Sequence, residues 1–539
     1  MANNVAALPR RLFARPEGLM LAALGAAAIT LVAAAVIGGR QAEGATTPTS
    51  VLGEQIGKTE TTDYGDLIEG PAVDPKETGG PAATTGSGGT GDAAGAGPAA
   101  AGPAAERQSV QGATRVGVFA DHFEIGVHAP ITFDGAPLNL AEDPITGLKG
   151  YITYVNRNGG VNGLKARLFI EDDRYTTAGG RQVADKLTKE IKPFIIEGTL
   201  GIDQIHKVAT ASKATGTPYM AGGGPEPEFQ EITDMYQIIS NYDQYADMVV
   251  EFICKYGAKY VGGSKPSDIR LGTTTLNSDF ILPVEKRFVQ KLSDRNCVRE
   301  PVDSRARGTI NKPTEQSSYG GQMIDLRASY DNQGANLVVP LQDPVSTSRQ
   351  VLEWRSSGYT PKWTIANFAH DSDTALTLFQ GAWTGMRVMS GACYYHPQGG
   401  GKPYDANLCA KMGEAKNQWV KLGPVTYDQN AGGCAGGKCE YDYNEASWTT
   451  DGSGGATGYQ LVYFWHGALN AIGTDPTREK FLSALNQYDN YSNLITGPIT
   501  FKGSSNPMVG STKFVLLEGQ SNLKYRQVTE ITPGLVDHF

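Results

Sequence analysis

The stretch GLKGYITYVNRNGGVNGLKARLFIEDDRY, residues 147–175, decides the fold class of this 539-residue chain. Leu148, Ile152 and Val155 recur at helical spacing along it, which predicts an amphipathic helix that packs against another element. The glycines at 159–160 end this helix, because glycine reaches left-handed backbone angles at low cost. The residues after them, LKARLFI, read as a strand, and so does FEIGVHAP before the helix. Strand, helix and strand in this order predict a parallel βαβ unit.

The alternation of strands and helices continues beyond this unit. Further strands are predicted at residues 194–198, 218–222, 269–275, 336–341 and 362–367, each preceded by residues with helical periodicity. A helix over residues 459–472, a shorter one at 481–485 and a hairpin-like pair at 497–501 and 512–519 close the chain. We therefore expect two doubly wound α/β lobes, since a chain of this length exceeds what one hydrophobic core usually serves.

The N-terminal part of the chain carries an uncharged apolar run at residues 19–39, long enough to cross about 30 Å of hydrocarbon as a helix. Arginines precede the run at positions 10, 11 and 15 and one arginine follows it, which places residues 1–18 in the cytoplasm and the rest outside. The run is either a retained membrane anchor, which we favour, or a signal peptide cleaved near the small residues 33–35. In both cases the bulk of the chain is predicted to be extracytoplasmic.

Residues 40–113 are predicted to form a flexible linker that spaces a folded head from the membrane. The part at 80–105 has no aromatic and no large aliphatic side chain, so it cannot offset the entropy cost of ordering. The formal net charge of −9 and the isoelectric point near 5.4 argue against nucleic acid as a partner, since no basic stripe counters them.

The chain has six cysteines, and in an oxidising compartment an even number predicts disulfides. Proximity along the chain favours the pairs Cys254–Cys297, Cys393–Cys409 and Cys434–Cys439, although six cysteines allow 15 pairings. A metal site is the alternative, and the spacing argues against it because no C-x-x-C pair is present. Residues 393–458, which contain four of the cysteines and show little periodicity, are interpreted as a disulfide-stapled insertion.

Several segments, taken in order, resemble a known family. FEIGVHAPIT, GYITYVNRNGGVNG, LFIEDDRY, FIIEGT, GTPYMAGGGPEPEF and YQLVYFWHGALNAI with ITGPITF are similar to the branched-chain amino acid and amide receptors of ABC importers, the type I periplasmic binding proteins. The resemblance spans residues 115–528 and implies two Rossmann-like lobes, joined by three crossovers, that close on a small solute. It also implies a first lobe of residues 114–238 and 367–495, with the insertion, and a second lobe of residues 239–366 and 496–539.

The candidate binding site is placed by a general property of α/β sheets. Ligands bind outside the carboxyl ends of the strands, where loops and helix starts present free N–H groups. The predicted ligand-binding residues on these loops are Phe133, Thr199, Gly201, Ile202, Asp203, Gly223, Gly224, Pro225, Asp279, Phe280, Gln342, Asp343 and Asn367. Gln342, Asp343 and Asn367 are expected to be the polar contacts. No cofactor and no metal are expected.

The chain departs from the pattern of the family's amino-acid receptors. The resemblance implies that those receptors hold the ligand carboxylate with a serine-rich helix start and its ammonium group with a threonine and an acidic residue. Aligned by the flanking strands, these positions hold Ile202, Pro225 and Asn367 here. Asp203 further disfavours a carboxylate, because its charge already occupies the favourable end of the helix dipole. A neutral, polyhydroxylated, aromatic or cationic solute is expected rather than an unmodified α-amino acid.

Other candidate residues have simpler interpretations. The acidic pair Asp172–Asp173 is interpreted as a solvated helix cap rather than a cation site, and the seven histidines as structural. The glycine runs match neither a P-loop nor a dinucleotide-binding fingerprint, and no hydrolase elbow or zinc-protease motif occurs. The chain is therefore not expected to be an enzyme.

The sequence leaves two functions open. The first is an extracytoplasmic solute receptor, anchored to the membrane, that delivers a small molecule to an ABC permease. The alternative is a surface-displayed interaction protein that keeps the fold while its cleft binds no solute, with the insertion at residues 393–458 contacting a protein partner.

Overall fold

The computed structural model describes residues 115–537 with gaps, the longer of which cover residues 223–234, 311–327, 391–409 and 428–438. Within these described residues, no helix is both long enough and apolar enough to span a membrane. The predicted cytoplasmic segment, apolar run and linker, residues 1–113, lie outside the described part of the chain.

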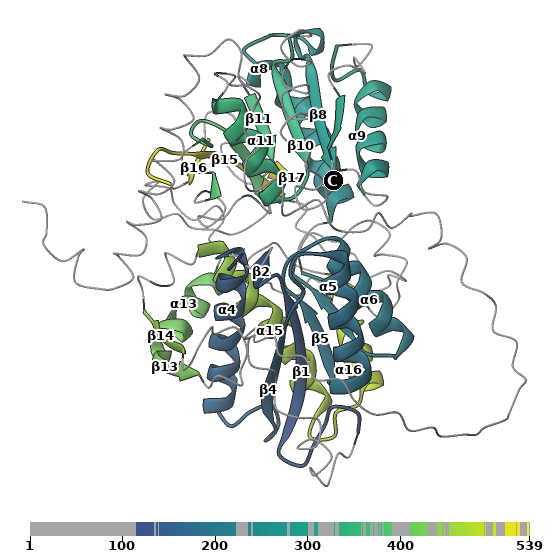
Figure 1. Cartoon of the computed structure of the whole chain (residues 1–539), viewed down its shortest axis with the longest axis vertical. Helices are drawn as coiled ribbons and strands as arrows, with labels where there is room; N and C mark the ends of the chain where they lie inside the picture. The colour runs from purple at the N-terminus through teal and green to yellow at the C-terminus, as the bar shows by residue number, and fades with distance from the viewer. Residues whose placement is uncertain are drawn as a thin grey trace, which may run out of the picture. The chain divides into compact units, whose positions relative to one another are not determined.

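The first lobe contains a sheet of five parallel strands in the order β4-β1-β5-β6-β7 (Figure 1). These strands are β1 (His122–Ala129), β4 (Lys165–Asp172), β5 (Ile195–Gly198), β6 (Tyr219–Ala221) and β7 (Met235–Gln237). Helix α4 (Asn139–Arg157) connects β1 to β4, and these two strands pair in parallel over their whole length. Gly159 and Gly160 follow the helix with φ angles of 98° and 81°. The predicted βαβ unit is confirmed.

Helices cover both faces of this first sheet, as a doubly wound fold requires. One face carries α5 (Thr177–Asp185), which continues as a π-helix (Lys186–Ile191), and α6 (Asp203–Ala214). Val183 of α5 and Ile196 of β5 share an apolar core there. The other face carries α4, α15 (Gly452–Ile472) and α16 (Arg478–Leu485). Their core with the sheet includes Val127, Leu148 and Trp465.

The second lobe contains an eight-stranded sheet in the order β16-β15-β12-β11-β10-β8-β9, with β17 paired to β15. Its strands are β8 (Leu271–Leu276), β9 (Arg307–Ile310), β10 (Leu337–Leu341), β11 (Trp363–Ala366), β12 (Arg387–Ser390), β15 (Lys513–Gly519), β16 (Tyr525–Gln527) and β17 (Val536–Asp537). Strands β8 to β12 pair in parallel, whereas β15, β16 and β17 are antiparallel additions. The described helices of this lobe are α7 (Tyr242–Phe252), a π-helix (Ile253–Gly257), α8 (Ala258–Tyr260), a 3₁₀ turn (Pro266–Asp268), α9 (Leu282–Asp294) and α11 (Pro344–Ser356).

The order of the elements shows that the chain passes between the two sheets three times, in agreement with the family resemblance. One boundary differs from the expected division, which places residues 387–390 in the first lobe. Strand β12 pairs with β11 and β15, so these residues belong to the second sheet and the second crossing follows them. A four-residue strand shows too little periodicity to be recognised in a sequence. The described partners of β15 are β12, β16 and β17, and most of the predicted partner at 497–501 lies outside the described residues.

The described part of the insertion is built into the first lobe. It comprises α13 (Ala410–Leu422) and an antiparallel hairpin of β13 (Gly423–Tyr427) and β14 (Cys439–Tyr443). Trp419 and Tyr443 are fully buried, and the Tyr443 hydroxyl donates to the carbonyl oxygen of Thr146 at 3.1 Å. Gly150 of α4 makes room for this ring, because a Cβ at that position would lie 2.7 Å from it. The expected irregular region is therefore regular and core-forming in this part.

The other two predicted disulfides lie wholly or partly outside the described residues. Each of the pairs Cys393–Cys409 and Cys434–Cys439 has at least one member outside the described residues.

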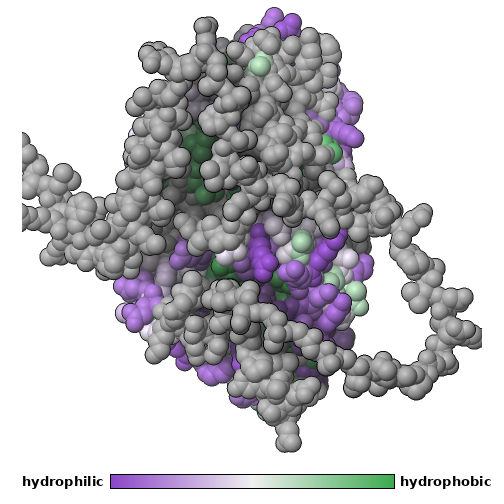
Figure 2. Space-filling view, in the orientation of Figure 1, coloured by the Kyte–Doolittle hydropathy of each residue, from purple (hydrophilic) through white to green (hydrophobic). Residues whose placement is uncertain are grey.

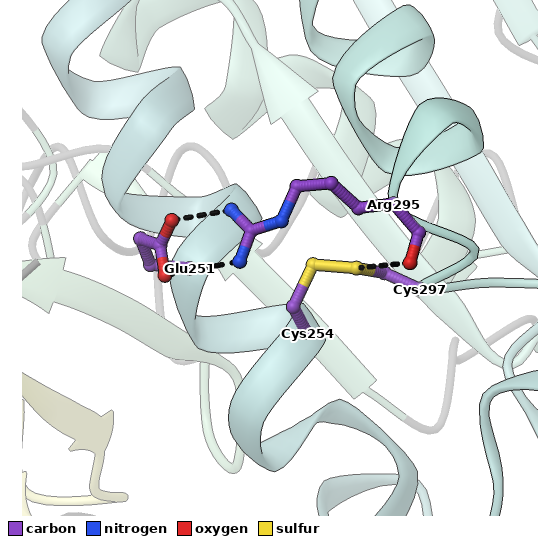
Figure 3. Close-up of a disulfide and its surroundings, with 4 residues drawn as sticks. All are labelled: Glu251, Cys254, Arg295 and Cys297. Carbon is purple, nitrogen blue, oxygen red and sulfur yellow. Dashed lines mark hydrogen bonds and ion pairs between the residues drawn. A yellow bond between two sulfur atoms is a disulfide. The ribbon is translucent and has the colours of Figure 1, made fainter.

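The second lobe contains the predicted disulfide Cys254–Cys297, which links the helical segment after α7 to the residues after α9. Three ion pairs also connect α7 with α9 and the residue that follows α9. Figure 3 shows the pair beside the disulfide. The three pairs are Arg287–Asp243, Lys291–Asp247 and Arg295–Glu251, each four residues from the next along both helices. The side chains of these pairs are partly exposed, so each pair contributes less than about 1 kcal/mol. The disulfide spans 43 residues, which corresponds to about 4 kcal/mol in the chain-entropy treatment.

We expect the double substitution Cys254→Ser with Cys297→Ser to lower the free energy of unfolding by about 3 to 4 kcal/mol, because it removes a constraint on the unfolded chain. The triple substitution Arg287→Gln, Lys291→Gln and Arg295→Gln should cost only about 1 to 2 kcal/mol, and mainly at low salt. Urea unfolding at low and high salt separates the two effects. A disulfide variant whose loss disappears at high salt, or an ion-pair variant that loses more than the disulfide variant, would contradict this ranking.

Glu197 is a carboxyl group buried in the core of the first lobe. It lies on β5 with an exposed fraction of 0%, and it accepts a hydrogen bond from the indole N–H of Trp465 on α15. Its Oε2 atom has no hydrogen-bond partner among the described residues. Burial raises the pKa of Glu197 to about 8, and the bond from Trp465 offsets only part of this effect. Glu197 is therefore mainly protonated at neutral pH.

The raised pKa of Glu197 makes the first lobe less stable at high pH. Because the folded-state pKa of about 8 exceeds the ordinary value of 4.5, the stability contributed by the protonated form is complete below pH 4.5 and is lost as the pH rises through 8. The loss is at most about 5 kcal/mol, since one pKa unit equals about 1.4 kcal/mol. We expect the free energy of unfolding of Glu197→Gln, relative to wild type, to rise over this range. The exposed Glu440→Gln serves as the matched control and should show no trend. If the free energy of unfolding of Glu197→Gln, relative to wild type, also shows no change with pH, the buried carboxyl is ionised throughout.

Candidate functional site

The predicted site residues follow the carboxyl ends of parallel strands in both lobes. Strand β5 ends at Gly198 and leads into α6, and strand β10 ends at Leu341 and leads into α11. Six predicted residues are fully described: Thr199, Gly201, Ile202, Asp203, Gln342 and Asp343. Only the backbone of Phe133 is described, in the two-residue strand β2 (Thr132–Phe133) that pairs with β3 (Ala136–Pro137). Gly223, Gly224, Pro225, Asp279, Phe280 and Asn367 lie outside the described residues.

The turn between β5 and α6 is held by its backbone. The amide of Thr199 donates to the carbonyl oxygen of His128 at 3.1 Å, and Gly201 has a φ of 135° that only glycine adopts readily. Ile202 occupies the N-cap position of α6 and supplies no side-chain hydrogen bond there. Its amide instead donates to Oε1 of Gln204 at 3.4 Å. The start of α6 therefore lacks the side-chain oxygen that usually occupies this position.

Ile202 makes apolar contacts beyond its own lobe. Its side chain is only 3% exposed and belongs to the same apolar core as Tyr242 and Tyr245 of α7 in the second lobe. Asp203 follows it in the first turn of α6, and the Thr177 hydroxyl donates to Asp203 at 3.4 Å. This helix start thus presents an apolar side chain and a carboxylate, and neither attracts a ligand carboxylate.

Asp343 and Gln342, predicted as ligand contacts, are both used inside the second lobe. Oδ1 of Asp343 accepts hydrogen bonds from the amides of Val345 and Ser346 at 2.9 and 3.1 Å, and Oδ2 accepts one from the Ser346 hydroxyl at 2.6 Å. Asp343 therefore caps α11. The side-chain amide of Gln342 donates to Gln350, which in turn donates to the hydroxyl of a threonine on β8 at 2.8 Å.

The acidic pair at the end of β4, Asp172 and Asp173, is not a solvated helix cap. Asp172 accepts hydrogen bonds from the amides of Ile131, Thr132 and Arg174 at 2.9 to 3.1 Å. Asp173 is 0% exposed, and its Oδ1 accepts from the amide of Tyr175 at 2.9 Å. The side chain that does cap the next helix is that of Thr176, which accepts from the amide of Gly179. The pair instead fixes the loop that follows the strand.

Behind this loop lies a buried chain of three polar side chains that the sequence interpretation missed. Nδ1 of His128 lies 2.8 Å from Oδ2 of Asp173, and Nε2 of His128 lies 2.6 Å from the hydroxyl of Tyr219. All three side chains are fully buried. Gly198 is required beside them, because a Cβ there would lie 2.0 Å from the Tyr219 hydroxyl. Burial raises the pKa of Asp173, and its bond with His128 opposes that shift.

Tyr175 is the residue that brings the two lobes together at the candidate site. Its side chain shares an apolar cluster with Val345 of α11, and its hydroxyl lies close enough to Asp343 to interact with it electrostatically. Tyr242 and Asp203 lie close enough to interact electrostatically with the same hydroxyl. Burial first, and then the neighbouring charge of Asp343, raises the pKa of Tyr175 well above its usual value. The rule that placed the other candidates at strand ends would also have selected Tyr175, because it follows β4 by three residues.

A metal centre finds no support in the part of the chain that the structure describes. No group of three or more histidine, cysteine, aspartate or glutamate side chains is arranged there to hold a metal ion.

Comparisons with solved structures agree with this architecture. A leucine-binding protein, LivK, from Thermotoga maritima MSB8 is 12% identical with a TM-score of 0.55, and the match covers 77% of this chain and 98% of that one. A possible leucine/isoleucine/valine-binding protein from Rhodopirellula baltica SH 1 is 15% identical with a TM-score of 0.56, covering 78% and 100%. The substrate-binding protein LivJ from Streptococcus pneumoniae, solved in complex with isoleucine, is 10% identical with a TM-score of 0.54, covering 76% and 99%.

At these identities, the likeness to solved structures shows a shared fold. A comparison with curated proteins found no match. A family model described as "Periplasmic binding protein" matches residues 123–428, which is more than half of the chain. The chain therefore belongs to the periplasmic binding protein family, with the type I fold that the leucine- and branched-chain amino acid-binding proteins share.

Proposed function

We propose that this protein is an extracytoplasmic solute-binding protein that captures a small molecule between its two lobes and delivers it to an ABC importer. The observation that carries the proposal is the meeting of strand-end loops from both sheets at one place. Tyr175 and Asp203 come from the first lobe, and Tyr242 and Asp343 come from the second. Parallel α/β sheets bind ligands at such strand ends, and family membership supports a role in ligand binding and delivery.

The mechanism is capture by lobe closure, without a chemical reaction. The two sheets are connected by three passages of the chain, as the order of the elements shows, and hinged closure is a common motion of lobes joined in this way. A solute drives closure only if it binds the closed form more tightly than the open form. Side chains that meet across the lobes, such as Ile202 and Tyr242, would contribute to that difference.

The proposed solute is not an unmodified α-amino acid. Ile202 offers no hydroxyl at the start of α6, and its amide already donates to Gln204. Asp203 in the first turn repels a second carboxylate. Asp203 and the nearby tyrosines instead favour a cationic, polyhydroxylated or aromatic solute.

The proposed partners are an ABC permease and, through residues 19–39, the cytoplasmic membrane. The apolar run supports this anchoring, while a cleaved signal peptide would give a secreted protein with the same head. In either case the folded head lies outside the cytoplasm.

A second candidate function, an interaction protein whose cleft binds no solute, is favoured by a specific observation. The side chains of Tyr175, Ile202 and Asp343 are at most 5% exposed, and those of Tyr175 and Ile202 pack against side chains of the other lobe. Against it, the described surface offers no large apolar docking patch. Val116 and Val420 are the large hydrophobic residues exposed among the described positions, and hydrophilic residues predominate among the coloured ones in Figure 2.

We expect thermal unfolding of the protein to be unchanged by leucine, isoleucine or valine at millimolar concentration. A cationic, polyhydroxylated or aromatic solute should raise the melting temperature, because a ligand at 100 times its dissociation constant adds about 2.7 kcal/mol to the free energy of unfolding. A panel of polyamines, quaternary amines, polyols, amides and aromatic amines covers these classes. For a hit, Asp203→Asn should weaken binding about tenfold in calorimetry, whereas the distant, exposed Glu440→Gln should leave it unchanged.

Two outcomes would overturn parts of this proposal. Saturable stabilisation by leucine would refute the proposed solute class while keeping the receptor function. If no solute of the panel raises the melting temperature, the alternative function as an interaction protein is favoured.

A further inference from the structure

We propose that His128 is a positioning residue that sets the first lobe's half of the candidate site before any solute binds. His128 lies near the end of β1, which pairs with β4 on one side and with β5 on the other. Its side chain is bonded to the loop after β4, and its backbone carbonyl is bonded to the loop after β5. The inference deepens the proposed function, and it rests on that function for the role of these loops.

The imidazole ring of His128 is held on both sides. Nδ1 lies 2.8 Å from Oδ2 of Asp173, and an ionised carboxylate can only accept, so Nδ1 carries a proton and donates it. Nε2 lies 2.6 Å from the hydroxyl of Tyr219, which can donate or accept. All three side chains are 0% exposed, so water does not compete for these bonds. The ring therefore has one orientation, set from the core of the first lobe.

The loop after β4 depends on this ring. Arg174 and Tyr175 both have left-handed angles, with φ of 55° and 56°, which non-glycine residues seldom adopt. Two consecutive residues of this kind persist only where the surroundings fix them. Asp172 accepts the amide of Arg174 and Oδ1 of Asp173 accepts the amide of Tyr175, each at 2.9 Å. Because the other oxygen of Asp173 is bonded to His128, the histidine fixes the carboxylate that holds the backbone of Tyr175.

The loop after β5 is placed by the backbone of the same residue. The amide of Thr199 donates to the carbonyl oxygen of His128 at 3.1 Å. Gly198 lets the strand pass close to the ring, because a Cβ there would lie 2.6 Å from Nε2 of His128. The turn into α6, with Ile202 at its start, is thus placed relative to the same histidine.

Both loops carry side chains that meet the second lobe. Tyr175 packs with Val345 of α11, and Ile202 packs with Tyr242 of α7. With these loops fixed from behind, a solute meets a first-lobe surface that is already formed. Pre-organisation of this kind lowers the ordering cost of binding. The second lobe then supplies the movable half of the site.

Hydrogen exchange of the full chain, followed by mass spectrometry without any solute, tests the positioning role. In His128→Asn the side-chain nitrogen takes the place of Nδ1 and can still donate to Asp173, whereas in His128→Gln it takes the place of Nε2 and cannot. We expect the amides of residues 172–176 to exchange about tenfold faster in His128→Gln and within about twofold of wild type in His128→Asn. His122→Gln is the matched control, because His122 also lies on β1 beside an aspartate, at the opposite end of the strand. It should leave this loop unchanged.

The two His128 variants separate positioning from a general loss of stability. Both lose the ring, so both should lower the melting temperature by similar amounts. Equal exchange of the loop in the two variants, or unchanged exchange in folded His128→Gln, would overturn the positioning role.

A second measurement needs no variant to fold. Nitrogen NMR of wild type with labelled histidine should show a proton on Nδ1 of His128 that exchanges slowly with water, because the ring is buried. A His128 ring without a proton on Nδ1 would also overturn the inference. Neither measurement uses a solute, so the positioning role and the proposed function can fail separately.

Discussion

Parallel pairing of β1 with β4 is the constraint on which the rest of the structure depends. Two parallel neighbours cannot be joined by a tight turn, so α4 must cross one face of the sheet between them. The same arrangement sends every carboxyl end of the sheet to one edge. Residues that are far apart in the sequence, such as His128, Asp173 and Thr199, therefore meet there. Polar groups lie together at this edge because the parallel strands all end there, whether or not a ligand binds.

The polar groups at this edge are mostly bonded to one another. Asp343 caps a helix, Gln342 is bonded to Gln350, and Asp173 is bonded to His128. Burying such groups is tolerable only when each has a partner. A solute must therefore either break existing bonds, at a cost, or bind beside them. This requirement makes Asp203, which is less buried, a better candidate for direct contact than Asp343.

Most of the fold could be predicted from the sequence, but only part of the candidate site could. The βαβ unit, both lobes, the α7 and α9 helices and Cys254–Cys297 follow from periodicity, glycine positions and cysteine spacing. Strand β12 was not predictable, because four residues within a region of weak periodicity carry no reliable signal. The roles of Asp173 and Tyr175 depend on burial and on left-handed backbone angles, which arise from tertiary contacts. An acidic pair in a sequence does not reveal whether it faces solvent or a histidine 45 positions away.

The insertion has a consequence for how partners of this protein can be sought. Its hairpin places Tyr443 in the space left by Gly150, and its helix α13 places Trp419 in the core beside α4. Cutting out residues 393–458 would strip α4 of its cover on the side of Thr146 and Gly150. If the truncated chain failed to bind a partner in a pull-down, the cause would then be damage to the first lobe rather than loss of a docking surface. Point changes on the outward side of α13, at exposed positions such as Val420, leave the interior filled and are the sounder way to probe this surface.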